Sequence, residues 1–352
     1  MRVSPLILSL PGLVSAQTGK SVWKKRLTGA DLDTFQRWSV AGTDLGIPYV
    51  LENGAIGFLF GDTFNTQWPE EPNNDWRAPV MLRSAINPGD ANGIVFDSAA
   101  GVGGNGNAPE IMHNGHRGDD GFGTYEISVI PNDGIGFPET GDQIVSYMSI
   151  KDWTAPWATN YAGLAISTDG NTFTRLDVKW PNDDANSDPF QMWTMQRDGD
   201  WVYIFSVRSG RQQGPMMLQR APWDQMVNQS AYQGWGWDGN NWGWGRPCTP
   251  ILQGNFGEPS VRKLSDGTWG MSYLNLDTKN IVTRTAAGPD QAWSDETVQV
   301  YWNQEPFLYG GFIHPWSTAN ASELYLMVSK WAHDPTTGAS TAYHVSQYVG
   351  SL

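Results

Sequence analysis

The sequence is poor in cysteine, in helix-forming runs and in positive charge. Cys248 is the one cysteine among 352 residues, so no internal disulfide can form. Runs of Ala, Leu, Glu and Lys at helical spacing are almost absent, which excludes a mainly helical fold. Beyond the amino terminus, no stretch reaches the roughly 18 consecutive apolar residues of a transmembrane helix. The net charge of −14 argues against nucleic acid and membrane surfaces as partners.

Several signatures of catalytic or cofactor sites are also missing. No G-x-S-x-G elbow, phosphate-binding loop or dinucleotide fingerprint occurs in the chain. His113 and His116 lie near Asp119 and Asp120, but the segment has the composition of a loop, and no helix fixes the histidine spacing for a metal. We therefore expect a solvated loop there, with no metal and no cofactor.

The first 16 residues have the features of a secretory signal. Arg2 precedes an apolar run over residues 6–14, and Ala16 is the small residue expected at a cleavage site. We therefore expect a secreted, extracellular protein that starts near Gln17. Residues 17–352 are expected to form a single domain.

The composition is rich in aromatic and turn-forming residues. The chain has 19 Trp, 12 Tyr and 13 Phe together with 40 Gly and 22 Pro, a balance typical of an all-β protein. Nineteen tryptophans exceed what a core of this size needs. We expect several of them on a binding face, because flat aromatic rings pack against the apolar faces of sugar rings.

A loose internal repeat divides the chain into five units. Each unit has a turn, an apolar strand, a loop and a second strand, and the turns lie at positions 53, 142, 199, 267 and 323. The mean unit of about 67 residues suits a four-stranded propeller blade with long loops. The pattern predicts a five-bladed β-propeller, with a β-sandwich as the competing fold.

Two aspartates flank the first repeat. Asp44 precedes an apolar strand, and Asp62 follows the next apolar strand after a hairpin turn at residues 52–54. A hairpin brings the two positions to the same end of the sheet, where the carboxyl groups can face one another. Each aspartate taken alone is more typical of a turn that caps its own backbone, so the pairing carries the functional interpretation.

The other acidic candidate is Glu258, just before the fourth repeat. Inner strands of a propeller converge on one channel, so acids from different blades can meet. Glycoside hydrolysis needs one acid to protonate the leaving oxygen and one carboxylate to activate water or attack carbon. A third acid can keep the first one protonated by like-charge repulsion. These residues indicate a glycosidase.

Arginines offer a rival interpretation, a sialidase-like clamp on a carboxylate. It would use Arg83, Arg208, Arg262 and Arg284, each in or next to an apolar strand. The carboxylate pair and the tryptophan content favour a neutral polysaccharide instead. Arg262 is an equally good candidate for an ion pair with Glu258 or Asp62.

Six short motifs occur in order along the chain. They are residues 43–46 (TDLG), 61–64 (GDTF), 76–84 with its Trp-Arg and Arg-Ser pairs, 157–163 with NYAG, 257–262 (GEPSVR) and 309–316 (YGGFIHPW). Together they resemble the endo-D-arabinanase family of glycoside hydrolases, over nearly the whole of residues 17–352.

The resemblance implies a five-bladed propeller that cleaves internal α-1,5 linkages between D-arabinofuranose units of mycobacterial arabinan. It implies Asp44 and Asp62 as the catalytic pair, with Glu258 as a modulator of their pKa or a substrate ligand, and leaves open which aspartate is the acid. The substrate-binding residues expected from the matched motifs are Trp76, Arg83, Trp157, Asn160, Tyr161, Arg262, Tyr309, His314 and Trp316. An L-arabinan substrate and a carbohydrate-binding propeller without catalysis remain as alternatives.

Overall fold

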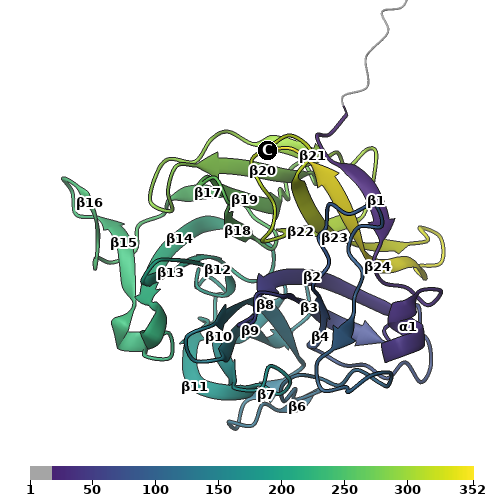
Figure 1. Cartoon of the computed structure of the whole chain (residues 1–352). Helices are drawn as coiled ribbons and strands as arrows, with labels where there is room; N and C mark the ends of the chain where they lie inside the picture. The colour runs from purple at the N-terminus through teal and green to yellow at the C-terminus, as the bar shows by residue number, and fades with distance from the viewer. Residues whose placement is uncertain (1–17) are drawn as a thin grey trace, which may run out of the picture.

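The computed structural model describes residues 18–352, which form five antiparallel sheets around a common centre (Figure 1). The predicted signal peptide lies outside the described residues. Within them, no helix has the length and apolarity needed to cross a membrane. The all-β, five-bladed propeller predicted from the repeats is confirmed.

The first two blades follow the plan of consecutive antiparallel strands from the centre outward. Blade 1 contains β2 (Gly42–Val50), β3 (Ile56–Phe64), β4 (Val80–Ser84) and β5 (Ser98–Ala99). Blade 2 contains β8 (Ser128–Phe137), β9 (Asp142–Asp152), β10 (Ala158–Ser167) and β11 (Thr174–Pro181). A small ribbon of β6 (Gly118–Asp119) and β7 (Tyr125–Glu126) precedes blade 2.

Blades 3 and 4 complete the far side of the ring. Blade 3 is larger, with β12 (Met192–Asp198), β13 (Trp201–Val207), β14 (Gln213–Pro222), β15 (Gln233–Trp237), β16 (Trp242–Trp244) and β17 (Leu252–Asn255). Short 3-10 turns, η1 (Trp223–Gln225) and η2 (Gln229–Ala231), connect β14 to β15. Blade 4 contains β18 (Ser260–Lys263), β19 (Trp269–Leu274), β20 (Ile281–Ala286) and β21 (Thr297–Val300).

The two ends of the chain close the ring within blade 5. This blade joins β22 (Leu308–Ile313), β23 (Leu324–His333) and β24 (Ser340–Gly350) to β1 (Val22–Arg26), which pairs with β24 as the outermost strand. The short helix α1 (Asp33–Trp38) then leads into blade 1. Closure by an amino-terminal strand ties the first and last blades together and protects the outer edge of β24.

The five repeat positions occupy the same place in each blade. Each turn lies between the first and second strands of a blade or at the start of the second strand. The longest interval follows the first turn, because the stretch between β4 and β8 also holds β5 and the β6–β7 ribbon. The strands β19 and β22 are buried along their whole length, because neighbouring blades cover both of their faces.

A buried ion pair joins four of the blades. Arg262 of β18 contacts both carboxylate oxygens of Asp133 in β8 at 2.8 Å and donates to the Pro48 carbonyl of β2 at 2.7 Å. Asp133 also accepts from the Thr194 hydroxyl and the Met195 amide of β12, at 2.9 and 2.8 Å. The predicted pairing of Arg262 with an acid of the site is therefore wrong, because its guanidinium is saturated by Asp133 and backbone oxygens.

The ion pair predicts a large stability difference between two acidic variants. Asp133→Ala leaves Arg262 buried without its counter-charge, and we expect a loss of about 3–5 kcal/mol in the free energy of unfolding. The control is Asp198→Ala, since Asp198 pairs with Lys263 at 2.7 Å but is partly exposed, and its loss should cost about 0–1 kcal/mol. Urea unfolding measures both. Equal costs would contradict the role of the buried pair.

Candidate active site

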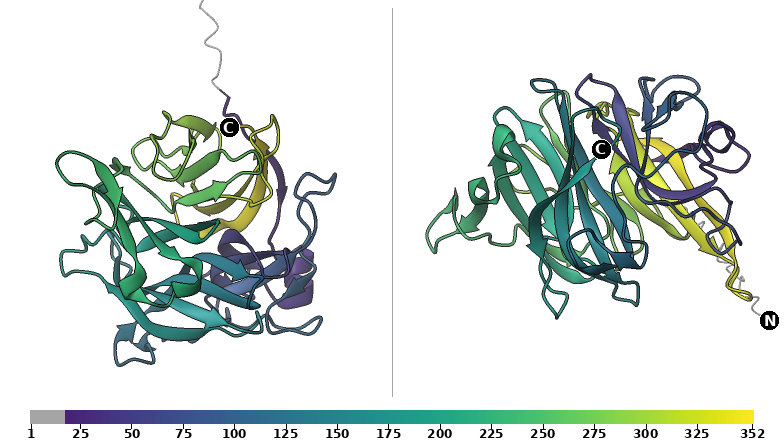
Figure 2. Two further views of the ribbon diagram at one scale, coloured as in Figure 1. Left: turned by 60° about the vertical axis from the view of Figure 1, so that its left-hand side comes forward. Right: turned by 90° about the horizontal axis from the view of Figure 1, so that it is seen from below.

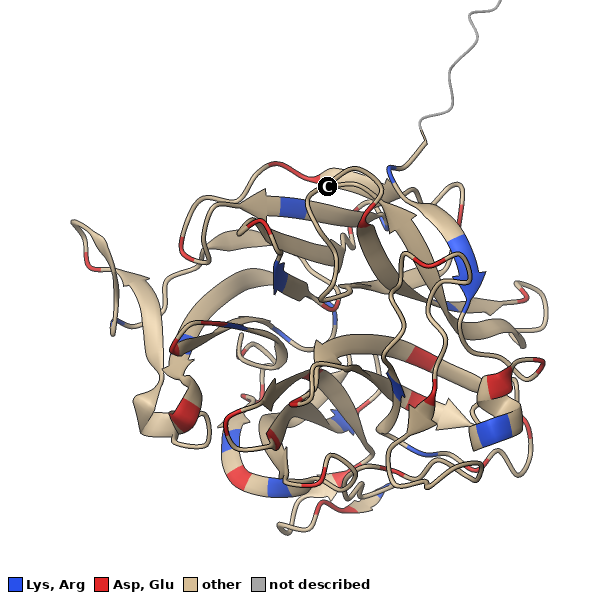
Figure 3. Cartoon of the chain, in the orientation of Figure 1, with Lys and Arg blue, Asp and Glu red and all other residues tan. Residues whose placement is uncertain are grey.

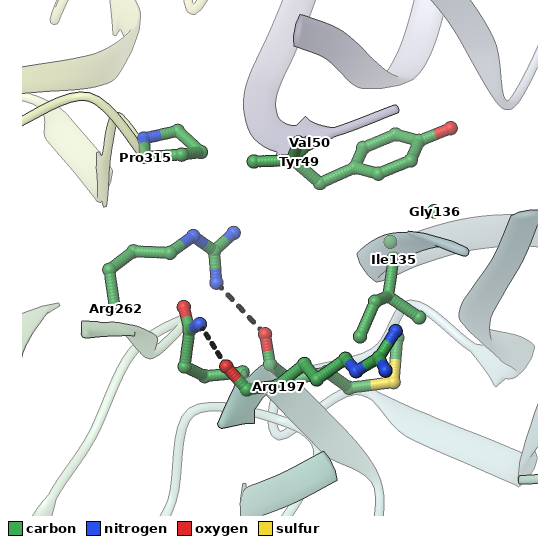
Figure 4. Close-up of a pocket in the computed structure, with 10 residues that line it drawn as sticks. Tyr49, Val50, Ile135, Gly136, Arg197, Arg262 and Pro315 are labelled. Carbon is green, nitrogen blue, oxygen red and sulfur yellow. Dashed lines mark hydrogen bonds between the residues drawn. The ribbon is translucent and has the colours of Figure 1, made fainter. Parts of the chain in front are cut away.

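The inner strands all start at one end of the ring, which we call the upper mouth, and end at the other, the lower mouth. A cavity of about 110 Å³ lies at the lower mouth, lined by Tyr49, Val50, Ile135, Gly136, Arg197, Arg262 and Pro315 among others (Figure 4). The three predicted catalytic acids lie instead at the upper mouth. Asp44 is near the start of β2, Asp62 is near the end of the adjacent β3, and Glu258 precedes β18.

A bulge aims Asp44 toward Asp62. Thr43 pairs with Thr63 and Leu45 pairs with Phe60, so Asp44 alone opposes both Gly61 and Asp62. Gly61 makes this approach possible, because a Cβ there would lie 2.5 Å from Oδ1 of Asp44. The two aspartates therefore lie at one end of the sheet, as the hairpin predicts, while the bulge that presses them together carries no signal in the sequence.

Asp44 is a carboxyl group held in its neutral form. Burial, and then the charge of Asp62, raises its pKa to about 8, with a further contribution from Glu258. The Tyr309 hydroxyl donates to Oδ2 at 2.8 Å and opposes this shift without cancelling it. Oδ1 is buried and has no hydrogen-bond partner among the described residues. At neutral pH, Asp44 therefore carries a proton in the site.

Asp62 has more support for the charged form. Its Oδ1 accepts from the Trp76 indole at 2.7 Å and from the Ser128 hydroxyl at 3.3 Å. The pKa of Asp62 is also raised above its ordinary value by burial, although these two donors and the nearby charge of His116 oppose the shift. The Tyr343 hydroxyl holds its backbone, donating to the Asp62 carbonyl at 3.1 Å. The negative charge of the pair therefore resides preferentially on Asp62.

Glu258 is paired with an arginine from blade 3. The Nε of Arg211 donates to Oε1 at 2.9 Å, and its guanidinium lies 4.9 Å from the centre of the Tyr309 ring. The other oxygen, Oε2, is buried without a partner among the described residues. Arg211 has a φ of 51°, a left-handed conformation in the turn between β13 and β14. Arg211 is thus a site residue that sequence reasoning missed.

His116 also reaches the site. Its Nε2 lies 2.6 Å from Oε1 of Glu110, and the carboxylate raises the pKa of His116 through this hydrogen bond. The His116 ring packs edge-on against Trp76, with 4.8 Å between ring centres, so it supports the indole that holds Asp62. The histidine loop is exposed to solvent, as expected, and His116 in addition supports a residue of the site. No group of three His, Cys, Asp or Glu among residues 18–352 could hold a metal ion.

Two predicted substrate-binding residues, Trp76 and Tyr309, lie at the acids as described. Four others lie elsewhere. Arg83 donates to Asn171 at the turn between β10 and β11. Arg262 is held in the central ion pair. The last two, His314 and Trp316, lie beyond the lower end of β22. His314 is only 1% exposed and packs against Phe58 and Trp316. These placements argue against substrate contact. They also separate Arg83 from Arg262, two of the four arginines of the sialidase-like clamp.

The remaining three predicted residues belong to blade 2. Asn160 donates to the Tyr125 carbonyl at 2.9 Å, and Tyr161 is buried, donating to Asp120 at 2.5 Å. Trp157 is partly buried near Trp153, with 5.7 Å between ring centres. None of the three contacts the acids, and their role in substrate binding stays a prediction. For Ser128, His116, Tyr343 and Arg211 no short motif signals a role, because each reaches the site only through the ring closure or a loop conformation.

The five-bladed ring has the same fold as solved structures of propeller glycoside hydrolases. The catalytic domain of a GH62 α-L-arabinofuranosidase from Coprinopsis cinerea aligns with a TM-score of 0.52 at 10% identity, over 95% of this chain and 97% of that one. A Bacteroides ovatus protein assigned only provisionally as a hydrolase aligns with a TM-score of 0.59 at 14% identity, over 89% and 86% of the two chains. At these identities the likeness is one of fold.

The family follows from the sequence. The family described as a domain of unknown function, DUF4185, matches residues 29–349, and the chain belongs to it. Notoamide biosynthesis cluster protein J' from Aspergillus versicolor is 59% identical over 353 residues, which cover 98% of this chain and 97% of that protein.

The raised pKa of Asp44 predicts a pH-dependent stability penalty. Folded Asp44 keeps its proton to about pH 8, whereas an unfolded aspartate loses it near pH 4, so stability falls as the pH rises between these values. The amide of the Asp44→Asn variant cannot ionise, so this penalty disappears. We expect the unfolding free energy of Asp44→Asn, relative to wild type, to increase by a few kcal/mol from about pH 4.5 to pH 8.

The control for this titration is Asp266→Asn, since Asp266 is an exposed turn residue between β18 and β19. Its stability difference from wild type should stay nearly constant over the same range. Chemical unfolding at several pH values measures all three proteins. A pH-independent difference for Asp44→Asn would show that the Asp44 carboxyl titrates normally.

Proposed function

We propose that this chain is a glycoside hydrolase in which Asp44 is the general acid and Asp62 is the carboxylate that activates water or attacks the sugar. The observation that carries the proposal is the unequal environment of the two groups. Burial and like charge keep Asp44 protonated, whereas Trp76 and Ser128 stabilise the anion of Asp62. Glycosidases obtain their acid and their base from two carboxyl groups in this way.

The proton transfers follow from these assignments. Asp44 gives its proton to the glycosidic oxygen as the bond from that oxygen to the anomeric carbon breaks. Asp62 takes a proton from the water that adds to the same carbon, so the hydrolysis is balanced and the pair then re-equilibrates with solvent. Glu258, fixed by Arg211, raises the pKa of Asp44 by its charge and has Oε2 free for a substrate hydroxyl.

For the substrate, we propose an arabinan with α-1,5-linked D-arabinofuranose units, cleaved internally by a secreted enzyme. The ordered motifs that resemble the endo-D-arabinanase family support this choice, and five of their residues gather at the upper mouth: Asp44, Asp62, Trp76, Glu258 and Tyr309. An L-arabinan is the nearest alternative, since its furanose units need the same acid and base.

A second candidate function comes from the relatives. The protein at 59% identity is named for a notoamide biosynthesis cluster, which favours a role in the metabolism of a small molecule. In that case the same acid and base would act on a small glycoside rather than on a polymer. A propeller that binds carbohydrate without cleaving it is the third possibility.

The activity test is incubation of the protein with mycobacterial arabinogalactan and, separately, with plant L-arabinan, followed by chromatography of the products. Oligosaccharides from the first substrate support the D-arabinanase proposal, and products from the second alone move the specificity to L-arabinan. If neither polymer is cleaved, the polysaccharide proposal fails, and hydrolysis of small glycosides tests the second candidate.

The same assay tests the assigned residues. We expect Asp62→Asn to lower turnover by roughly 10²–10⁴-fold with the fold intact, because the amide cannot accept a proton from water. Asp266→Asn at the lower end of blade 4 is the matched control and should keep wild-type turnover. Circular dichroism verifies the fold of both variants. A folded, fully active Asp62→Asn protein would overturn the assignment of Asp62.

A further inference from the structure

A tryptophan hairpin, residues 233–244, projects from the outer edge of blade 3 (Figures 1 and 2). Its strands β15 and β16 pair Trp235 with Trp244 and Trp237 with Trp242. Side chains alternate along a strand, so the four indoles share one face of the hairpin. The sequence alternates Trp with Gly through both strands, which leaves the opposite face without side chains between the tryptophans.

The glycine face is pressed against the chain that follows it. A Cβ at Gly236 would lie 1.9 Å from the Pro247 carbonyl oxygen, and one at Gly234 would lie 2.3 Å from the Arg246 carbonyl oxygen. The backing strand is also hydrogen-bonded, with the Thr249 amide donating to the Trp235 carbonyl at 3.0 Å. The following chain therefore supports the tryptophan hairpin on its glycine face, and the indoles point away from that face.

The indoles form a continuous row from the blade to the tip. Trp244 is anchored on blade 3, with its ring 5.6 Å from Tyr203 and 4.2 Å from the guanidinium carbon of Arg220. Trp235 contacts Trp244 at 5.0 Å and lies nearly parallel to Trp242, with 17° between the planes and 5.8 Å between the centres. At the tip, Trp237 and Trp242 are 46% and 41% exposed.

The chemistry of this row selects its ligand. None of the four indole N–H groups has a hydrogen-bond partner among the described residues. The neighbouring charges are paired, since Asp238 contacts Arg246 at 2.7 Å. The hairpin thus offers flat apolar faces and free donors, and Arg220, which donates to the neutral Gln233, lies only at its inner end beside Trp244. Sugar rings match the first two features, with apolar C–H faces for stacking and hydroxyl oxygens as acceptors.

Other occupants fit less well. The net charge of −14 opposes close approach of a second copy of the chain or of an anionic lipid surface, and acidic side chains are spread around the ring rather than gathered away from blade 3 (Figure 3). Exposed apolar patches of this kind mark binding surfaces when they are structurally supported. A neutral, hydroxyl-rich polymer meets no such repulsion.

We propose that the tryptophan hairpin is a second carbohydrate-binding surface, which holds a polysaccharide chain by stacking on Trp237, Trp242 and Trp235 at a distance from the acids of the upper mouth. The identity of the ligand as a glycan rests on the proposed function. Trp235 and Trp242, nearly parallel and adjacent, supply a flat area for consecutive sugar units. The surface would hold a polymer near the enzyme without taking part in bond cleavage.

Affinity electrophoresis tests this surface without depending on turnover. The Asp62→Asn protein is run in native gels that contain arabinogalactan, L-arabinan, arabinoxylan or a β-glucan, and its mobility gives a dissociation constant. We expect retardation by at least one polymer. Adding Trp237→Ala and Trp242→Ala should weaken binding by roughly tenfold or more, because aromatic anchors dominate such contacts.

The matched control adds Trp23→Ala instead, since Trp23 is an isolated tryptophan of β1 with 58% of its surface exposed. Its retardation should equal that of the parent. Unchanged retardation of the double tryptophan variant, or no retardation of the parent by any polymer, would overturn the proposal. A change from dimer to monomer in the double variant on gel filtration would also overturn it, because the tryptophan hairpin would then serve self-association.

The outcomes of the two proposals are separable. Turnover by wild type without tryptophan-dependent retardation would reject the binding surface and leave the hydrolase standing. Tryptophan-dependent retardation without turnover on any glycan would reject the hydrolase and keep the binding surface.

Discussion

Crowding of negative charge at the upper mouth constrains the rest of the site. Asp44, Asp62 and Glu258 come from β2, β3 and the approach to β18. The charges of Asp62 and Glu258 raise the pKa of Asp44, and burial raises the pKa of both aspartates. Three partly buried carboxyl groups share this mouth, so the site must supply a cation or retain a proton. Arg211 satisfies Glu258, hydrogen-bond donors satisfy Asp62, and Asp44 keeps its proton. Chemical asymmetry thus follows from the arrangement of nearly identical groups.

The propeller supplies the rigidity that this arrangement needs. The Arg262–Asp133 ion pair connects β18 to β8 and, through the Pro48 carbonyl and Thr194, to β2 and β12. Of these strands, β2 carries Asp44, β8 begins with Ser128 and β18 follows Glu258 at the upper mouth. Pairing of β1 with β24 then fixes blade 5, which contributes Tyr309 and Tyr343. The acids of the upper mouth stay close together because these contacts hold their strands in place.

Local pattern was sufficient to predict the fold and the position of the acids. Alternating apolar strands and turn residues indicated five blades, and the hairpin after Asp44 placed it beside Asp62, since both are properties of contiguous sequence. Residues that act through tertiary contacts were less accessible. Arg262 and His314 lie in conspicuous motifs but serve the core, because a motif does not reveal which way a strand residue faces. Arg211 was missed because a left-handed turn and the closed ring bring it to Glu258.

The pKa of Asp44 is the quantity on which the proposed chemistry depends. The direct measurement is a ¹³C titration of aspartate side-chain carboxyl groups in the folded protein, with the Asp44 signal identified by its absence in Asp44→Asn. We predict a midpoint at about pH 8, which moves to lower pH in Asp62→Asn because one neighbouring negative charge is removed. A midpoint near the ordinary aspartate value of about 4, unaffected by Asp62→Asn, would contradict the assignment of Asp44 as the acid.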